Sequence, residues 1–229
     1  MISIKGRFVK GPNIVRDGLV LHLDAASPRS YPGSGTVWTD LGINRFNGTL
    51  TNSPTFNSAN GGSIVFTRTS SQYVALTPSF SGPPITFLGF IRRNGAQFSD
   101  NAGVFFDRVG SNTASGIHMA GSGGGVGYHW NDAANTYGWT SGLISPDQQW
   151  CMVALVVTST SATLYMNLTS ATNNVTHNNR TFTSFRIAQD DLPGRFFNGN
   201  VANLLVYTRA LSSTEIAQNY NALKQRFGL

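Results

Sequence analysis

The sequence predicts an all-β fold, an antiparallel two-sheet jelly-roll sandwich that ends in one short C-terminal helix. Short apolar and β-branched runs recur along the 229 residues, and clusters of Gly, Asn, Ser and Pro separate them. A chain of this length buries about 70% of its unfolded surface, and sandwiches of this size commonly form single domains. We therefore expect one sandwich domain over residues 18–229, preceded by an N-terminal basic arm over residues 1–17.

Nine runs have the composition of β-strands. In chain order they are Leu19–Leu23, Ser63–Phe66, Tyr73–Leu76, Ile85–Ile91, Val104–Arg108, Trp150–Val157, Thr163–Met166, Phe182–Ile187 and Phe197–Tyr207. Turn-forming residues lie between them, so we expect the strands to pair antiparallel in two stacked sheets.

The predicted helix follows the last of these strands. Ser212 and Glu215 have the S-x-x-E spacing of a capping box, and Leu211 and Ile216 occupy the hydrophobic staple positions. The apolar stripe of the helix consists of Ile216, Tyr220, Leu223 and Phe227. Gly228 is placed to cap the C-terminal end.

Several motifs carry a family resemblance. The end of the last strand and the helix start share a Y-x-R-A-L-S and E-I signature, which here comprises Tyr207, Arg209, Ala210, Leu211, Ser212, Glu215 and Ile216. The opening GLVLHLDAASPRSYPGSGTVWTDL and the later NGTL, NGGSIVF, QYVAL and WCMVALVVTSTSATLYMN extend the match over residues 18–229. The chain resembles the laminin G-like, concanavalin A-like lectin/glucanase superfamily, as it occurs in tailed-bacteriophage virion proteins. The resemblance implies a concanavalin A-like sandwich.

The net charge of +6 arises from few acids rather than from many bases. The basic residues concentrate only in the N-terminal arm, at Lys5, Arg7, Lys10 and Arg16. Such an arm is either a disordered terminus or an anchor that orders on a larger particle. Four separated charges without interleaved aromatic residues form a weak phosphate-tracking surface, so we expect no nucleic-acid binding.

The sequence contains no apolar run of about 20 residues, the length that a membrane-spanning helix requires. The N-terminal segment also lacks an apolar signal core, so we expect synthesis in the cytoplasm without membrane insertion. The single cysteine, Cys151, cannot form an intrachain disulfide, and its apolar neighbours predict a core position. The span from Met1 to the helix end favours a stand-alone subunit.

The acidic residues argue against catalysis. The resemblance includes glycoside hydrolases that use paired glutamates, and retaining hydrolysis requires two carboxyl groups about 5 Å apart. This chain contains one glutamate, Glu215, which the helix cap already uses. Asp190 and Asp191 are adjacent, but neighbours on a strand point to opposite faces. With no G-x-S-x-G motif either, we expect no enzymatic activity.

Calcium is the cofactor that the resemblance suggests, because many relatives bind it. Many relatives carry acidic residues where this chain has Thr67 and Ser71, which argues against a calcium site at that edge. The remaining candidate metal ligands are Asp190 and Asp191, in the loop AQDDLPGR. Their alternative role is turn formation, through side chains that bond back to the main chain.

The segment Gly121–Gly142 is the predicted ligand-facing region. It combines glycines with aromatic and hydrogen-bonding side chains, which together suit a sugar. The candidate glycan-binding residues are Tyr128, Trp130, Asn131, Asp132, Tyr137 and Trp139. The alternative is that aromatic residues at alternate positions, such as Tyr128 and Trp130, face the core of the sandwich.

Together these observations predict a non-enzymatic bacteriophage virion structural protein, either a capsid decoration or a tail-associated subunit, with weak binding of host or environmental glycans. The alternative is a dedicated receptor-binding lectin module of a tail fibre or spike. The expected partners are other virion proteins and cell-surface glycans. We also expect a homo-oligomer on the particle and localisation in the virion after synthesis in the host cytoplasm.

Overall fold

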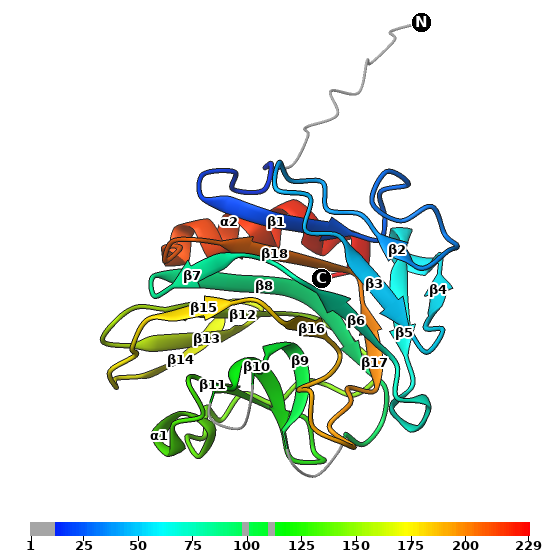
Figure 1. Ribbon diagram of the computed structural model, residues 1–229. Helices are drawn as coiled ribbons and strands as arrows, with labels where there is room; N and C mark the ends of the chain where they lie inside the picture. The colour runs from blue at the N-terminus through cyan, green and yellow to red at the C-terminus, as the bar shows by residue number, and fades with distance from the viewer. Residues whose placement is uncertain (1–11, 98–100, 110–112) are drawn as a thin grey trace, which may run out of the picture.

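The computed structural model describes residues 12–97, 101–109 and 113–229. In this part of the chain two antiparallel sheets pack against each other, and a helix follows the last strand (Figure 1). The prediction of an all-β, two-sheet sandwich with one short C-terminal helix is confirmed. The structure adds a four-residue helix, α1 (Ala134–Tyr137), that the sequence did not predict.

The larger sheet contains nine strands in the described residues. They are β1 (Leu19–Asp24), β4 (Thr55–Asn57), β5 (Ser63–Phe66), β8 (Ile85–Arg93), β12 (Trp150–Val157), β13 (Ala162–Met166), β14 (Thr169–Asn173), β17 (Gly199–Val201) and β18 (Asn203–Tyr207). Strand β8 is central: β12, β13 and β14 follow on one side. On the other side β8 pairs first with β17, which leads to β5 and β4, and then with β18, which leads to β1.

The smaller sheet has the strand order β11-β10-β9-β16-β6-β3-β2. Its strands are β2 (Val37–Trp38), β3 (Gly48–Thr51), β6 (Tyr73–Leu76), β9 (Ala102–Asp107), β10 (Ser115–Ala120), β11 (Gly125–His129) and β16 (Phe185–Ile187). Two further strands, β7 (Phe80–Gly82) and β15 (Arg180–Phe182), pair with each other. Short 3-10 turns are η1 (Ala59–Gly61), η2 (Arg68–Ser70) and η3 (Lys224–Phe227).

The main core fills the space between the two sheets, and aromatic rings form its centre. Phe87 of β8 stacks on Phe185 of β16 with ring centroids 5.6 Å apart, and Phe182 meets Phe87 edge-on at 5.3 Å. Each large buried ring removes apolar area from water and contributes about 2–3 kcal/mol. These contacts hold the two sheets together.

A second core lies between the larger sheet and α2 (Ser213–Leu223), which runs beside β1 and β18 in Figure 1. Ile216 is fully buried in this core. Phe227, in η3, stacks on Phe90 with centroids 4.6 Å apart. The predicted apolar stripe is therefore correct in its contacts, although the last turn is a 3-10 turn rather than α-helix.

The predicted capping box is present at the start of α2. The Glu215 N–H donates to Ser212 Oγ at 3.3 Å, and the Ser212 N–H donates to Glu215 Oε2 at 2.9 Å. Arg209 adds two bonds to the same carboxylate, at 3.0 and 2.6 Å. Gly228 ends the helical segment in the left-handed region, with φ of 71°, as predicted.

The prediction of one strand over Phe182–Ile187 is wrong, because this run divides into β15 and β16 of different sheets. Asp107 explains the break. The N–H groups of Thr183 and Ser184 donate to Asp107 Oδ2 at 3.0 and 2.8 Å instead of joining a ladder. Arg180 forms an ion pair with the same buried carboxylate.

The prediction of one strand over Phe197–Tyr207 also needs correction. The run forms β17 and β18, which are separated at Ala202. The Ala202 N–H donates to Phe90 O at 3.0 Å, and its carbonyl accepts from the Ala25 N–H at 2.9 Å. The two halves therefore stay along β8 but have different neighbours on their other side, β5 and β1.

Residues 12–17, assigned from sequence to the basic arm, lie against α2 and β18. Val15 is buried, its N–H donates to Asn219 Oδ1 at 2.8 Å, and its carbonyl accepts from Tyr207 Oη at 3.0 Å. Arg16 is exposed. The other predicted anchoring residues lie outside the described residues; they are Lys5, Arg7 and Lys10. No helix in the described ranges is long and apolar enough to cross a membrane.

Candidate functional site

The predicted ligand-facing segment, Gly121–Gly142, forms one end of the smaller sheet. It comprises the turn after β10, then β11, α1 and a loop that returns along β11. That loop is held by two backbone bonds of 2.8 Å, from the Val126 N–H to Leu143 O and from the Ser145 N–H to Gly124 O. The edge of the sheet at β11 is therefore covered by the chain itself.

Two of the predicted glycan-binding residues lie in the core. Tyr128 is 0% exposed and Trp130 is 2% exposed, so neither ring face can stack on a ligand. Their polar atoms are satisfied internally: Tyr128 Oη lies 3.0 Å from His177 Nε2, and Trp130 Nε1 donates to Asn178 O at 2.7 Å. For these two residues the alternative of core packing is correct.

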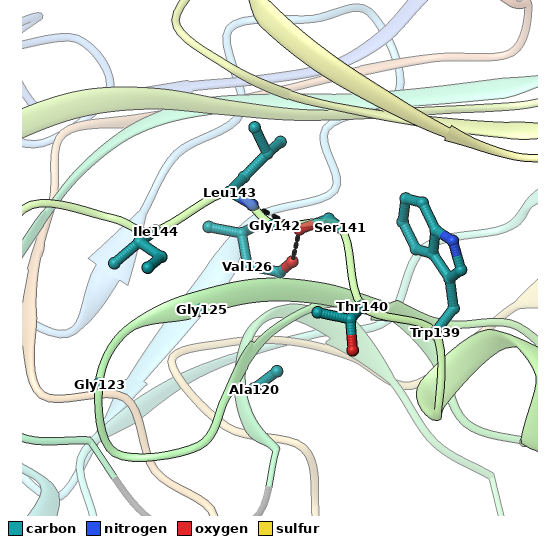
Figure 2. A pocket seen from close by; sticks show the side chains of 10 residues that line it. All are labelled: Ala120, Gly123, Gly125, Val126, Trp139, Thr140, Ser141, Gly142, Leu143 and Ile144. Atoms are coloured by element: carbon teal, nitrogen blue, oxygen red, sulfur yellow. Dashed lines mark hydrogen bonds between the residues drawn. The ribbon is translucent and has the colours of Figure 1, made fainter.

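Trp139 lines a hollow of about 360 Å³, which we call the apolar hollow. The residues around it are Ala120, Gly123, Gly125, Val126, Trp139, Thr140, Ser141, Gly142, Leu143 and Ile144. Figure 2 shows the Trp139 indole on one side of the hollow and Ile144 on the other. The indole is partly buried, because it packs edge-on against Tyr128 at 5.9 Å, and Ile144 is 62% exposed.

The shape of the apolar hollow depends on local backbone contacts. Ser141 Oγ donates to Val126 O and accepts from the Leu143 N–H at 3.1 Å, which fixes the loop that carries Trp139 (Figure 2). Gly125 faces Ala120 O so closely that a Cβ would lie 2.9 Å from it. The described residues around the hollow include no charged side chain, so a neutral ligand with apolar C–H surfaces suits it.

Asp132 and Tyr137 line a different hollow of about 340 Å³, the polar hollow, together with Asn101, Arg108, His129, Leu192 and Arg195. The Tyr137 ring stacks on His129 with centroids 5.2 Å apart, and His129 Nδ1 lies 3.3 Å from Asp132 Oδ1. Asn131, the remaining candidate, lies in the turn before α1 with φ of 49° and lines neither hollow. The predicted residues therefore separate into two hollows, the core and, for Asn131, a turn outside both hollows.

Two histidines are buried next to the polar hollow. His118 is fully buried, His129 is nearly so, and their ring centroids are 4.8 Å apart. Burial, followed by the charge of Arg195, lowers the pKa of His118 to about 3. Burial also lowers the pKa of His129 to about 2, with smaller effects from His118, Arg108 and Arg195. Both rings are therefore neutral at pH 7.

The predicted calcium ligands, Asp190 and Asp191, are both bound by arginines. Asp190 Oδ2 lies 3.3 Å from Arg108 Nη2 and 3.0 Å from Arg195 Nη1, while Asp191 Oδ1 lies 2.7 Å from Arg186 Nη2. Burial raises the pKa of Asp190, and Arg195 and Arg108 oppose that effect. Guanidinium groups thus take the positions that a cation would need, and this pair does not fit calcium.

The alternative role of the two aspartates fits better. Asp190 Oδ1 accepts from the Leu192 N–H at 3.1 Å, which is the bond of an Asx turn, and Asp191 has φ of 62°. No group of three or more His, Cys, Asp or Glu side chains in the described ranges could hold a metal ion.

Glu215 is also committed to structure. Its hydrogen bonds with Arg209, followed by those with Ser212, lower the pKa of this carboxyl to about 2. Its side chain lines neither hollow. Sequence reasoning missed Arg108 and Arg195, because they follow β9 and precede β17, and only the folded chain brings them to Tyr137.

Comparison with solved structures identifies the same fold in carbohydrate-active proteins and toxins. Domain 4 of an extracellular GH43 arabinanase from Geobacillus stearothermophilus, solved with arabinotriose, has a TM-score of 0.71 and 15% identity over 88% of this chain and 98% of that one. Trypanosoma rangeli sialidase, solved with the inhibitor DANA, has a TM-score of 0.69 and 12% identity over 93% of this chain. The binding domain of botulinum neurotoxin DC, solved with SialylT, has a TM-score of 0.63 and 12% identity over 90% of this chain.

The present chain covers 34% of the sialidase and 51% of the neurotoxin chain. The comparison with curated proteins gave no match. A family model described as the concanavalin A-like lectin/glucanases superfamily matches residues 66–217, which is most of the sandwich. The chain therefore belongs to the concanavalin A-like lectin/glucanases superfamily.

Proposed function

We propose that the domain binds carbohydrate without cleaving it, and that the apolar hollow beside Trp139 is the binding site. The observation that carries this proposal is a partly exposed indole at the side of a hollow that has aliphatic walls and the hydroxyl group of Thr140. Aromatic faces cover the C–H surfaces of sugar rings, while hydroxyls and backbone groups bond to sugar hydroxyls.

The similar structures support this proposal through the fold. The arabinanase domain was solved with arabinotriose, and the neurotoxin binding domain was solved with SialylT. Their identity to this chain is 15% or less, so their ligands do not transfer residue by residue. What supports a site in this chain is the geometry around Trp139.

The carboxylates support a role without hydrolysis. Retaining hydrolysis uses two carboxyl groups about 5 Å apart, one as nucleophile and one as acid/base. Glu215 is held by Arg209 and the helix cap, and Asp190 is fully buried between two arginines. Asp132 is the one carboxylate among the described residues that line either hollow.

The test is isothermal titration calorimetry with neutral oligosaccharides, including arabinotriose, on the wild-type protein and on Trp139→Ala. A matched control is Trp150→Ala, which removes an indole from a different part of the surface, beside Asn60 and Phe227. We expect Trp139→Ala to weaken binding about tenfold or more and the control to leave it within about twofold. Thermal unfolding of both variants checks that they are folded.

A neutral oligosaccharide that binds equally well to wild-type protein and Trp139→Ala would refute the apolar hollow as the site. Absence of binding to every neutral probe would refute the proposed function. Release of reducing ends from any bound oligosaccharide would show that the domain is an enzyme.

We further propose that the domain is part of a phage particle. It would act there as a capsid decoration, a tail-associated subunit or a receptor-binding module of a fibre or spike. Its support is the resemblance of the opening over residues 18–41, with the NGTL, NGGSIVF and QYVAL motifs that follow it, to domains of phage virion proteins. Mass spectrometry of purified virions is the test. Detection at a fixed copy number per particle supports a virion role, and absence from the particle refutes it without affecting the carbohydrate proposal.

A further inference from the structure

The outer face of the smaller sheet is covered at β9, β10 and β11 by an unusual set of side chains. Alternate residues of these strands point outward, and here they include Phe106, His118 and His129. Phe106 and His118 each meet the His129 ring edge-on, at 5.2 and 4.8 Å. The outer face of an antiparallel sheet is commonly polar and solvated, whereas this one holds a buried aromatic layer beneath the polar hollow.

Two arginines at the polar hollow share one carboxylate. Asp190 Oδ2 accepts from Arg108 and from Arg195, and Asp190 itself is fully buried. The Arg195 side chain is 23% exposed. Within the described residues its side-chain hydrogen bond is made by Nη1, so Nε and Nη2 remain as donors. A guanidinium with two N–H groups on one edge is shaped to bind a carboxylate in bidentate fashion.

The other walls of the polar hollow suit a sugar ring. Tyr137 is 40% exposed, and its ring is held in place by stacking on His129. The Asp132 side chain is 28% exposed, and its Oδ2, which is not used by His129, can accept hydrogen bonds from a ligand. The hollow therefore combines an aromatic face for C–H groups, a carboxylate for hydroxyls and a guanidinium edge for a negative group.

We propose that the polar hollow is a second binding site, separate from the apolar hollow, and that it takes a saccharide bearing a carboxylate. The sugar carboxylate binds the free edge of Arg195, the ring lies on Tyr137, and hydroxyls donate to Asp132. Arg108 adds positive charge at the same wall. The inference goes beyond the proposed function, because it assigns a different place on the surface and a charged class of ligand.

The experiment compares an acidic probe with its neutral counterpart. Tri-galacturonate and its carboxyl-reduced form, which is a neutral galactose trisaccharide, are titrated into the wild-type protein by calorimetry. 3′-Sialyllactose and lactose form a second matched pair. We expect at least one acidic probe to bind about tenfold more tightly than its neutral partner, with an affinity that falls as salt is raised.

Four variants locate the site. Arg195→Gln should remove the preference for the acidic probe, a loss of about tenfold, and Tyr137→Ala should weaken binding without disturbing the Asp190 ion pairs. Arg186→Gln is the matched control, because Arg186 has similar exposure and pairs with Asp191 but does not line the hollow. Trp139→Ala should leave binding of the acidic probe within about twofold.

The proposal is overturned if neither acidic probe binds, if acid and neutral forms bind equally, or if Arg186→Gln weakens binding as much as Arg195→Gln. It is also overturned if Trp139→Ala abolishes binding of the acidic probe, since the site would then be the apolar hollow. Acidic binding that survives Trp139→Ala while neutral sugars fail to bind supports this site and refutes the proposed neutral one.

Discussion

Tyr137 and Trp139 are two positions apart in the chain, yet they line separate hollows. Tyr137 ends α1 and stacks on His129, while Trp139 follows α1 and packs against Tyr128. The short helix α1 and the residues directly after it therefore present one aromatic residue to each of the two candidate sites. Anything that displaces α1 should affect both.

The first prediction concerns Thr136, which holds α1 in place. Its Oγ1 accepts from the Trp130 N–H at 3.0 Å and donates to Ala133 O at 2.7 Å, and the side chain is buried. Thr136→Val keeps the shape but removes both bonds and should cost about 1–3 kcal/mol. We expect weaker ligand binding at both hollows, measured by calorimetry.

The control for this variant is Thr169→Val on the exposed edge strand β14. That substitution changes the same atoms at a solvated position, where the effect should be within about 0.5 kcal/mol. If Thr136→Val binds both classes of sugar as tightly as the wild-type protein does, α1 does not depend on this hydroxyl.

The second prediction concerns Trp130, which the sequence alone makes a candidate for sugar stacking. Because its indole is buried and bonded to Asn178, Trp130→Ala should leave a cavity and destabilise the domain by about 3–5 kcal/mol. Urea denaturation measures the change. Trp139→Ala, at a partly exposed position, should cost clearly less, and equal costs for the two variants would contradict their different burial.

Strands were predictable where apolar alternation is flanked by turn residues. The runs Ser63–Phe66, Tyr73–Leu76 and Trp150–Val157 match β5, β6 and β12 residue by residue. Strands β10 and β11 were missed, because glycines within and beside them usually indicate turns.

Packing explains why those glycines lie within strands. A Cβ at Gly127 would lie 2.4 Å from His118 Nε2, and a Cβ at Gly116 would lie 2.1 Å from Phe105 O. These glycines allow the backbones of neighbouring strands to approach closely, and that requirement depends on residues distant in sequence.

The polar hollow could not be predicted from the sequence for the same reason. Tyr137 and Asp132 belong to one suggestive segment, but Arg195 joins them only through the fold.

The third prediction concerns Glu215 at the start of α2. Glu215→Gln removes the charge that pairs with Arg209 and weakens the capping box. Since both side chains are about a quarter exposed, we expect a modest loss of about 1 kcal/mol in the free energy of unfolding. Asp17→Asn is the control, because Asp17 pairs with the same Arg209 but its side chain is 88% exposed.

The two Glu215 and Asp17 variants should be compared by urea denaturation at pH 7. The part of the lost unfolding free energy that comes from the ion pair should decrease in high salt, while the part that comes from the capping box should persist. A loss for Asp17→Asn as large as that for Glu215→Gln would mean that the capping box contributes nothing measurable.

The last prediction concerns pH and the buried histidines. The pKa values of His118 and His129 in the folded protein, about 3 and about 2, lie below the ordinary value of 6.5. At a pH between the folded and ordinary values, the unfolded chain therefore binds protons that the folded chain does not. Their contribution leaves stability unchanged above pH 6.5 and lowers it as the pH falls below 6.5. At pH 5.0 the cost is about 2 kcal/mol for each ring.

His118→Leu should remove the loss of stability at low pH that His118 causes, without creating a new charge. Burial lowers the pKa of His22 and of His177 as well, so all four histidines act in the same direction and some pH dependence should remain. Glu215 adds little in this window, because its carboxyl titrates below pH 4.5 in both states. The measurement is the free energy of unfolding in urea at pH 7.5 and pH 5.0 for both proteins. The loss between the two pH values should be about 2 kcal/mol smaller in His118→Leu, and an equal loss in both proteins would show that His118 is not held neutral in the fold.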